Sequence, residues 1–110
     1  MQAKGKKMTN AKNDIDVPAW DVALANLVKD EFGKKNEPLT LEDFNRLAKE
    51  YTIRLDDIMV TMFEMVIAGE WKYEGEQTIV RATLNDLYVG GRLHAKDLEP
   101  FSGGWSPRAD

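Results

Sequence analysis

The sequence predicts an α+β fold, mainly α: three helices, then a C-terminal β-hairpin and a short extra helix. Three observations lead to this prediction. Apolar residues recur every three or four positions over residues 18–68, which is the period of an α-helix. After Gly69 the period changes to two, as in a strand. The length of 110 residues, without an internal repeat, is that of one ordinary domain.

The first helix is expected between Asp16 and Gly33. Asp16 can cap its amino-terminal end, and Pro18 suits a first turn because its missing N–H would be unpaired there in any case. Gly33 is expected to end the helix before a polar loop that closes at Pro38. The apolar stripe comprises Trp20, Ala23, Leu24, Leu27, Val28 and Phe32.

The second and third helices are expected to follow each other closely. Thr40 with Asp43 forms a variant of the capping box, so the second helix opens at Thr40 and continues to Tyr51. Only residues 52–54 separate it from the third helix, which must therefore turn sharply against it. The third helix is predicted over residues 55–68, and Gly69 is its expected stop.

The carboxyl-terminal part carries strand and turn signals. Trp71 and Tyr73 lie two apart, and the β-branched residues 78–80 follow a glycine, which predicts a hairpin between them. Two alternatives exist farther on: a short helix over residues 83–88 with Thr83 as its cap, or a tight hairpin at Gly90-Gly91. The helix is the favoured alternative.

Three stretches of different composition are expected along the chain. Residues 1–15 lack apolar periodicity and should form a flexible basic tail, either a solubilising leader or an arm for an acidic partner. Residues 16–100 form a single domain, and the turn-rich residues 101–110 form a mobile tail whose Trp105 either docks on the body or is available to a partner. The net charge is −4, and residues 1–14 carry +3, so residues 15–110 carry −7.

Three helices, the second and third tightly joined, followed by a two-stranded ribbon, form an order that resembles the winged helix-turn-helix superfamily. The resemblance covers residues 18–82 and is one of pattern, without a diagnostic motif. Winged-helix domains commonly bind DNA and many mediate protein contacts, so the resemblance implies a fold before a function. It implies that the helix over residues 55–68 would enter a major groove.

The predicted third helix is poorly suited to a groove. Its solvent side is expected to carry Asp56, Asp57 and Glu64 and no base. Carboxylates near phosphates are repelled and release no condensed counterions. An alternative role for Asp56 and Asp57 is to oppose the helix dipole in the first turn.

The same helix is more apolar than one core requires. Val60, Met65 and Ile67 exceed a single stripe, as happens when a helix is buried on more than one side. Either a second helix of this chain, near residues 84–89, or a partner chain would cover the surplus. We therefore expect a non-catalytic protein-interaction or adaptor module whose partner is another protein or a second copy, as a homodimer. Its predicted interface comprises Asp57, Val60, Thr61, Glu64, Ile67 and Trp105.

Two other functions remain as alternatives. A DNA-binding transcriptional regulator would hold phosphates through Arg46, Lys49, Arg54, Lys72 and Arg81, although glutamates interrupt these cations. A small-anion binder would use backbone N–H groups of the loop Gly90–Lys96.

Catalysis, metals and membranes are disfavoured. The chain has no cysteine and His94 is its only histidine, so we expect no metal site and no cofactor. The cluster Asp86, Arg92, His94 and Asp97 has the residue types of a catalytic site, but its spacing matches no motif that requires them, so we expect no enzyme. No apolar run is long enough to span a membrane, and we expect a cytoplasmic protein without a membrane partner.

Overall fold

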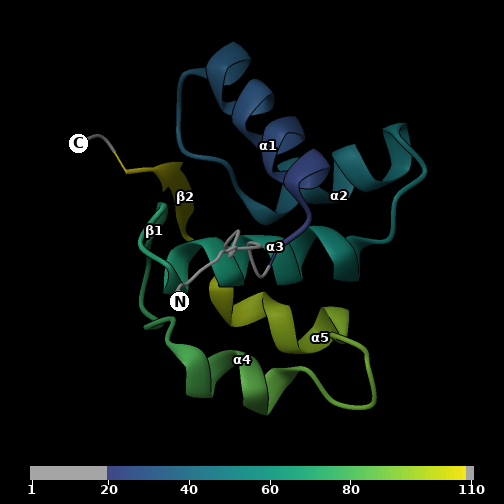
Figure 1. Ribbon diagram of the computed structural model, residues 1–110, viewed down its shortest axis with the longest axis vertical. Helices are drawn as coiled ribbons and strands as arrows, with labels where there is room; N and C mark the ends of the chain where they lie inside the picture. The colour runs from purple at the N-terminus through teal and green to yellow at the C-terminus, as the bar shows by residue number, and fades with distance from the viewer. Residues whose placement is uncertain (1–19, 109–110) are drawn as a thin grey trace, which may run out of the picture.

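The computed structural model describes residues 20–108. This part of the chain contains five α-helices, one 3-10 helix and a two-stranded antiparallel sheet, which confirms the predicted α+β, mainly α class. Helix α3 (Leu55–Ile67) runs through the middle of the fold, with α1 and α2 on one side and α4 and α5 on the other (Figure 1). The predicted basic tail, residues 1–15, lies outside the described residues.

Helix α1 spans Val22–Lys35. The Asp21 carboxylate accepts hydrogen bonds from the N–H groups of Ala23 and Leu24, at 2.9 and 3.2 Å, and so satisfies free donors of the first turn. The predicted cap Asp16 and the first-turn residue Pro18 lie outside the described residues.

The prediction that Gly33 ends α1 is wrong. The helix continues to Lys35 and ends at Asn36, whose φ of 57° is left-handed and whose N–H donates to the Phe32 carbonyl at 2.7 Å. Glycine inside a helix costs only about 1 kcal/mol, and asparagine adopts the left-handed region with little strain. The stop therefore occurs three residues later than expected.

Helix α2 spans Leu41–Glu50, and its capping box is confirmed. The Asp43 carboxylate accepts from the Thr40 N–H at 2.9 Å and from the Thr40 hydroxyl at 3.3 Å. The same carboxylate accepts from the Lys35 ammonium at 2.6 Å, so it ties the end of α1 to the start of α2.

The connection between α2 and α3 is as short as predicted and has the hydrogen bonds of a Schellman motif. The Ile53 N–H donates to the Ala48 carbonyl at 2.9 Å, and the Thr52 N–H donates to the Lys49 carbonyl at 3.4 Å. Thr52 occupies the position that glycine usually takes, with a φ of 54°. A β-branched residue in this conformation is strained.

The predicted third helix is confirmed as α3, which ends one residue earlier than expected at Ile67. Gly69 has a φ of 83°, its N–H donates to the Val66 carbonyl at 3.0 Å, and the Glu70 N–H donates to the Met65 carbonyl at 2.9 Å. These bonds form a second Schellman motif, here with glycine at the left-handed position.

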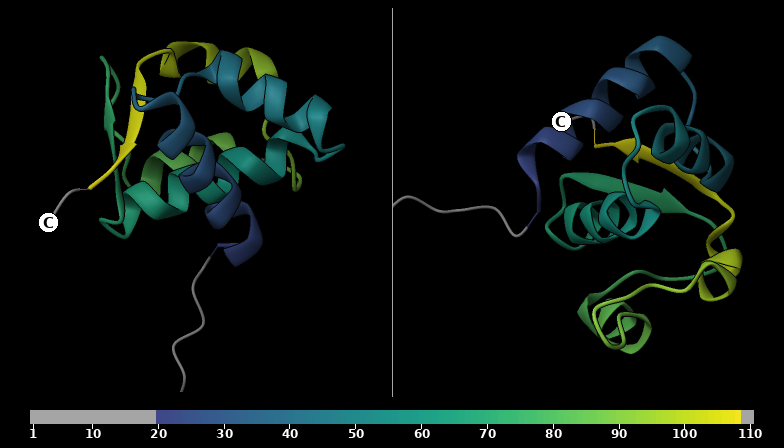
Figure 2. Two further views of the ribbon diagram at one scale, coloured as in Figure 1. Left: turned by 90° about the horizontal axis from the view of Figure 1, so that it is seen from above. Right: turned by 90° about the vertical axis from the view of Figure 1, so that its right-hand side faces the viewer.

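Strand β1 spans Trp71–Glu74 where a strand is predicted, but its partner is not residues 78–80. β1 pairs with β2 (Gly104–Pro107), in the register Trp71 to Pro107 and Tyr73 to Trp105 (Figure 2). The expected partner fails because Ile79 is buried in the core and Val80 is the N-cap of α4. Residues 75–103 are thus inserted between the two strands, and we call them the insertion.

The insertion contains α4 (Arg81–Leu87), α5 (Ala95–Leu98) and the 3-10 helix η1 (Glu99–Phe101). The predicted helix at 83–88 is therefore present but starts two residues earlier. Thr83 is inside its first turn, where the hydroxyl accepts from the Val80 N–H at 3.1 Å.

The glycine turn of the second alternative also occurs, directly after α4, but it closes an isolated bridge and not a hairpin of two strands. Val89 and Arg92 exchange two backbone hydrogen bonds of 3.1 Å around Gly90-Gly91, whose φ values are 60° and 75°. Two consecutive positive φ values are readily adopted by glycine, so the sequence suits this turn.

Trp105 lies at the centre of the core, so the prediction of a mobile tail over 101–110 is wrong for residues 101–108. Its side chain is 0% exposed, and its ring meets those of Phe44, Phe63 and Tyr73 at centroid distances of 5.9, 5.5 and 4.7 Å. Its backbone also exchanges hydrogen bonds of 2.8 and 2.9 Å with Leu39. Burial of so large a ring, together with paired backbone groups, outweighs the flexibility of the flanking glycines.

Candidate functional site

Helix α3 is packed by its own chain on opposite sides, with α1 and α2 on one side and α4 on the other (Figure 1). Of its apolar surplus, Met65 is buried, whereas Val60 and Ile67 are only partly covered. Of the predicted interface residues, Thr61 is 2% exposed and Trp105 is 0% exposed. The prediction is wrong for Trp105, whose side chain is inaccessible to a partner, and Thr61 offers almost no exposed surface. Thr61 tolerates burial because its hydroxyl donates to the Asp57 carbonyl at 2.9 Å.

The carboxylate of Glu64, another predicted interface residue, is occupied within the chain. It receives two hydrogen bonds from the Arg81 guanidinium, at 2.7 and 2.8 Å, and only 13% of its side chain is exposed. Glu64 lies on α3 and Arg81 on α4, so this bidentate pair joins the insertion to the central helix.

Asp56 makes a second connection to the insertion. Its carboxylate accepts from Arg92 Nε at 2.6 Å, from the Leu93 N–H at 3.2 Å and from Arg54 at 3.2 Å. The expectation that Asp56 lies on the solvent side of α3 is wrong, since the residue is 8% exposed.

The surroundings of Asp56 stabilise its charged form. Burial by itself would raise the pKa of the Asp56 carboxyl, but the hydrogen bonds from Arg92, from the Leu93 N–H and from Arg54 outweigh it. The pKa of Asp56 is therefore held below its ordinary value of 3.8. The carboxylate stays ionised at neutral pH and holds the insertion to α3.

The loop predicted to bind a small anion already holds this internal anion. Arg92 and the Leu93 N–H are the donors that the loop Gly90–Lys96 directs at Asp56. His94 is exposed at the start of α5. The Arg92 side chain is thus engaged with Asp56 and not with Asp86 or Asp97, the acids of the candidate catalytic cluster. This contact disfavours both the anion site and the catalytic cluster.

Two of the predicted interface residues remain open to solvent together. Asp57 and Val60 line a hollow of about 160 Å³ between the start of α1, the first half of α3 and the end of α4. We call it the Tyr88 hollow; its lining is Trp20, Asp21, Leu24, Asp57, Val60, Thr61 and Tyr88. Ile67 lies at the other end of α3, half-buried against the core.

Tyr88 and the sequence neighbours of two lining residues expose apolar side chains. Tyr88 is 45% exposed, and the residue that follows it, Val89, is 61% exposed. Val22, next to Asp21, is 54% exposed. Single exposed apolar residues are common, but here an aromatic residue borders a hollow with apolar walls, as at the centres of protein interfaces.

The cations proposed as phosphate anchors are mostly neutralised within the chain. Four of the five lie within 4.0 Å of a carboxylate: Arg46, Arg54, Lys72 and Arg81. They are spread over α2, the start of α3, β1 and α4, so they do not form one basic surface.

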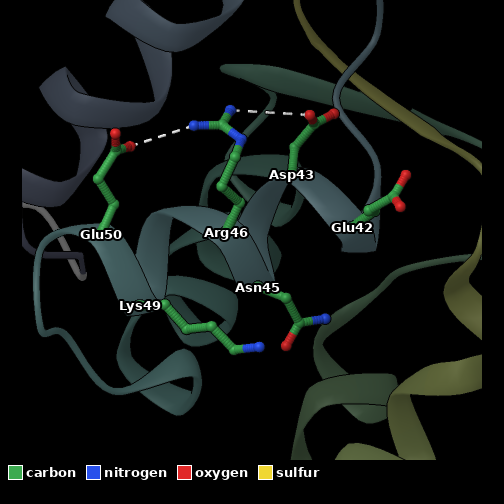
Figure 3. Close-up of a pocket in the computed structure, with 6 residues that line it drawn as sticks. All are labelled: Glu42, Asp43, Asn45, Arg46, Lys49 and Glu50. Atoms are coloured by element: carbon green, nitrogen blue, oxygen red, sulfur yellow. Dashed lines mark hydrogen bonds and ion pairs between the residues drawn. The ribbon is translucent and has the colours of Figure 1, made fainter.

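Arg46 is the most heavily paired of these cations. Its guanidinium contacts Glu31, Glu50 at 3.1 Å and Asp43 at 3.9 Å, and it points between the last two acids, whereas Lys49 points away from it (Figure 3). Within residues 20–108, Lys49 has no carboxylate within 4.0 Å. The open hollow over this face, about 700 Å³, is lined by charged and amide residues of α2 alone: Glu42, Asp43, Asn45, Arg46, Lys49 and Glu50.

One further feature was not predicted from the sequence. A groove of about 610 Å³ lies between α4 and the α5–η1 segment. We call it the α4–α5 groove; its lining is Gln77, Thr78, Ala82, Thr83, Asp86, Leu87, Lys96, Asp97, Glu99, Pro100 and Phe101. These residues come from three segments that only the fold brings together, so no local sequence motif predicts the groove.

The comparisons with known proteins identify no relative. No family model, no curated protein and no solved structure matches the chain. In the described part of the chain, no helix has the length and apolarity needed to cross a bilayer. Nor do residues 20–108 group three or more histidine, aspartate or glutamate side chains where they could hold a metal ion.

Proposed function

We propose that the chain is a non-catalytic protein-interaction module that receives one apolar side chain of its partner in the Tyr88 hollow. The observation that carries the proposal is the hollow itself, with apolar walls from Trp20, Leu24, Val60 and Tyr88 and with Asp21 and Asp57 among its lining residues. Its volume of about 160 Å³ is that of roughly five water molecules. Sites for cofactors and drug-sized ligands measure roughly 300–1,000 Å³, so a single side chain is the better match.

The order of elements supports a winged-helix-like arrangement within this proposal. Three helices with a tight second connection precede two antiparallel strands, as the resemblance implies. The insertion departs from the winged-helix order of elements, because residues 75–103 separate the strands and cover α3. A helix that is packed on opposite sides offers little surface to a DNA groove, which favours a protein partner over DNA.

Site-specific photo-crosslinking tests the proposal. A photoreactive phenylalanine derivative replaces Tyr88 in one variant and Lys49, on the α2 face, in a matched control. After irradiation in a nuclease-treated host lysate, we expect a discrete protein adduct from position 88 and none from position 49. The mass of the adduct distinguishes a second copy of this chain from another protein.

A second substitution makes the test specific. Val60→Lys places a charge in the hollow without altering the photoreactive residue, and we expect it to abolish the adduct at position 88. An adduct that survives Val60→Lys, or equal adducts at positions 88 and 49, would contradict the proposal.

Duplex binding tests the DNA-binding alternative directly. Fluorescence anisotropy with a mixed-sequence DNA duplex at low salt should show no binding, since four of the five candidate cations are paired internally. Binding that weakens steeply as salt rises would favour the regulator instead.

A further inference from the structure

We infer that the α4–α5 groove is a second binding surface, separate from the Tyr88 hollow, and that it takes a basic, extended segment of a protein partner. Helix α4 forms one wall and the α5–η1 segment forms the other, with Gln77 and Thr78 also in the lining. The groove's volume of about 610 Å³ is within the range of built ligand sites.

The negative charge of the groove favours a positively charged partner. Asp86, Asp97 and Glu99 line it against a single base, Lys96. Within residues 20–108, none of these three acids lies within 4.0 Å of a basic group. Asp56 and Glu64 on α3, by contrast, are fully engaged with arginines. The groove acids therefore keep their charge available to a partner, and a basic partner is complementary to it.

The apolar part of the groove selects the kind of basic residue. Its lining includes Ala82, Leu87, Pro100 and Phe101 among the acids and hydroxyls. Lysine and arginine combine an apolar stem with a charged end, so the stem can lie on these apolar residues while the charge reaches a carboxylate. Gln77 and Thr78 add exposed polar side chains that can bond to the backbone of an extended segment.

This surface is independent of the proposed function. Leu87 lines the groove and the next residue, Tyr88, lines the hollow, so the end of α4 separates the two. A partner in one does not require a partner in the other, and substitutions of the groove acids leave the walls of the hollow unchanged.

A peptide titration of the isotope-labelled full chain tests the inference. The probe is an eight-residue peptide of alternating lysine and leucine with both ends blocked, and its counterpart has glutamate in place of lysine. We expect chemical-shift changes confined to residues 77–87 and 96–101 with the lysine peptide, weakened by added salt, and none with the glutamate peptide.

Matched variants separate a site from general attraction. The groove variant Asp86→Asn, Asp97→Asn, Glu99→Gln and the control variant Asp30→Asn, Glu37→Gln, Glu42→Gln remove equal charge from exposed positions. We expect the groove variant to lose about tenfold or more in affinity and the control variant to bind as the parent does. Thermal unfolding of all three proteins shows that the variants fold.

The inference would be overturned by equal losses of peptide affinity in both variants, by shifts spread over the whole acidic surface, or by no shifts at about 1 mM peptide. Shifts at Trp20, Val60 and Tyr88 in place of the groove would also overturn it, while supporting the hollow. Failure of the hollow in the crosslinking test leaves the peptide result unaffected, so the two proposals fail separately.

Discussion

The three-helix body and the insertion share one hydrophobic core but are attached to α3 in different ways. The body, residues 20–74 with β2, encloses an aromatic centre in which Phe44 and Phe63 meet Trp105 edge to face. The insertion adds buried residues to the same core, and the ring centroids of its Phe101 and of Phe63 lie 5.1 Å apart. It is also attached to α3 by the Arg81–Glu64 and Arg92–Asp56 ion pairs.

This difference changes the meaning of the acids on α3. The sequence predicts that Asp56 and Glu64 lie on the solvent side of α3, where they would border a protein interface. In the fold they bind the arginines of the insertion. A charged helix face is therefore no evidence for a partner until the segments that pack on it are known. Asp57 is exposed and lines the Tyr88 hollow, so it keeps an interface role in our proposal.

Removal of the central ring should affect both regions at once. We expect Trp105→Ala to lower the free energy of unfolding by about 3–5 kcal/mol, because it leaves a large cavity where α2, α3 and the sheet meet. Chemical denaturation measures the loss. Trp105→Phe is the control and should cost less, since it keeps a ring and removes an indole N–H that has no hydrogen-bond partner among the described residues. A loss below about 1 kcal/mol for Trp105→Ala would contradict the central role of this residue.

Loss of the Asp56 carboxylate should loosen the insertion more than the body. Asp56→Asn weakens the bond to Arg92 and the bond from the buried Leu93 N–H, so we expect a loss of roughly 1–3 kcal/mol. Hydrogen exchange should accelerate at residues 88–98 before it does in α2. The neighbouring exposed residue gives a control: Asp57→Asn should stay within about 0.5 kcal/mol. Uniform acceleration across α2 and the insertion would show that the two regions open together.

Acid should reproduce the effect of that substitution. The folded-state pKa of Asp56 is below its ordinary value of 3.8, so its stabilising contribution is present above that pH and is lost as the pH falls through the folded pKa. The unfolding free energy of the parent should therefore decline below about pH 4 more than that of Asp56→Asn. Asp43, whose pKa is also lowered, titrates in both proteins and does not affect the difference. Parallel pH profiles for the two proteins would show that Asp56 is not the responsible group.

Relief of backbone strain should have the smallest effect and stabilise the body. Thr52 has a left-handed φ of 54°, and we expect Thr52→Gly to raise the unfolding free energy by about 1 kcal/mol. Asn36, with a φ of 57°, is the matched position where asparagine already suits the conformation, so Asn36→Gly should gain less. Thermal unfolding compares them. Equal gains would mean that the β-branched side chain is not the source of the strain.

The site was only partly predictable from the sequence. Asp57 and Val60 were placed on an accessible face correctly, because helical spacing fixes the direction of a side chain relative to its neighbours. Thr61 and Trp105 were misplaced because spacing does not reveal what packs outside a helix or whether a glycine-flanked tryptophan is buried. The α4–α5 groove was missed because its walls are joined by a turn and its residues share no short motif.

Local signals, which act over a few residues, define the helices and several of their ends. The Thr40–Asp43 capping box, the turn at Thr52 and the stop at Gly69 depend on hydrogen bonds between groups at most five positions apart, and such bonds need no knowledge of the rest of the fold. The segments that cover α3 and the partner of β1 depend instead on contacts between residues far apart in the chain. The Asp56–Arg92 contact joins residues 36 positions apart and the Gly103–Tyr73 bond joins residues 30 apart, and many distant partners satisfy the same local pattern equally well until burial of the core selects one.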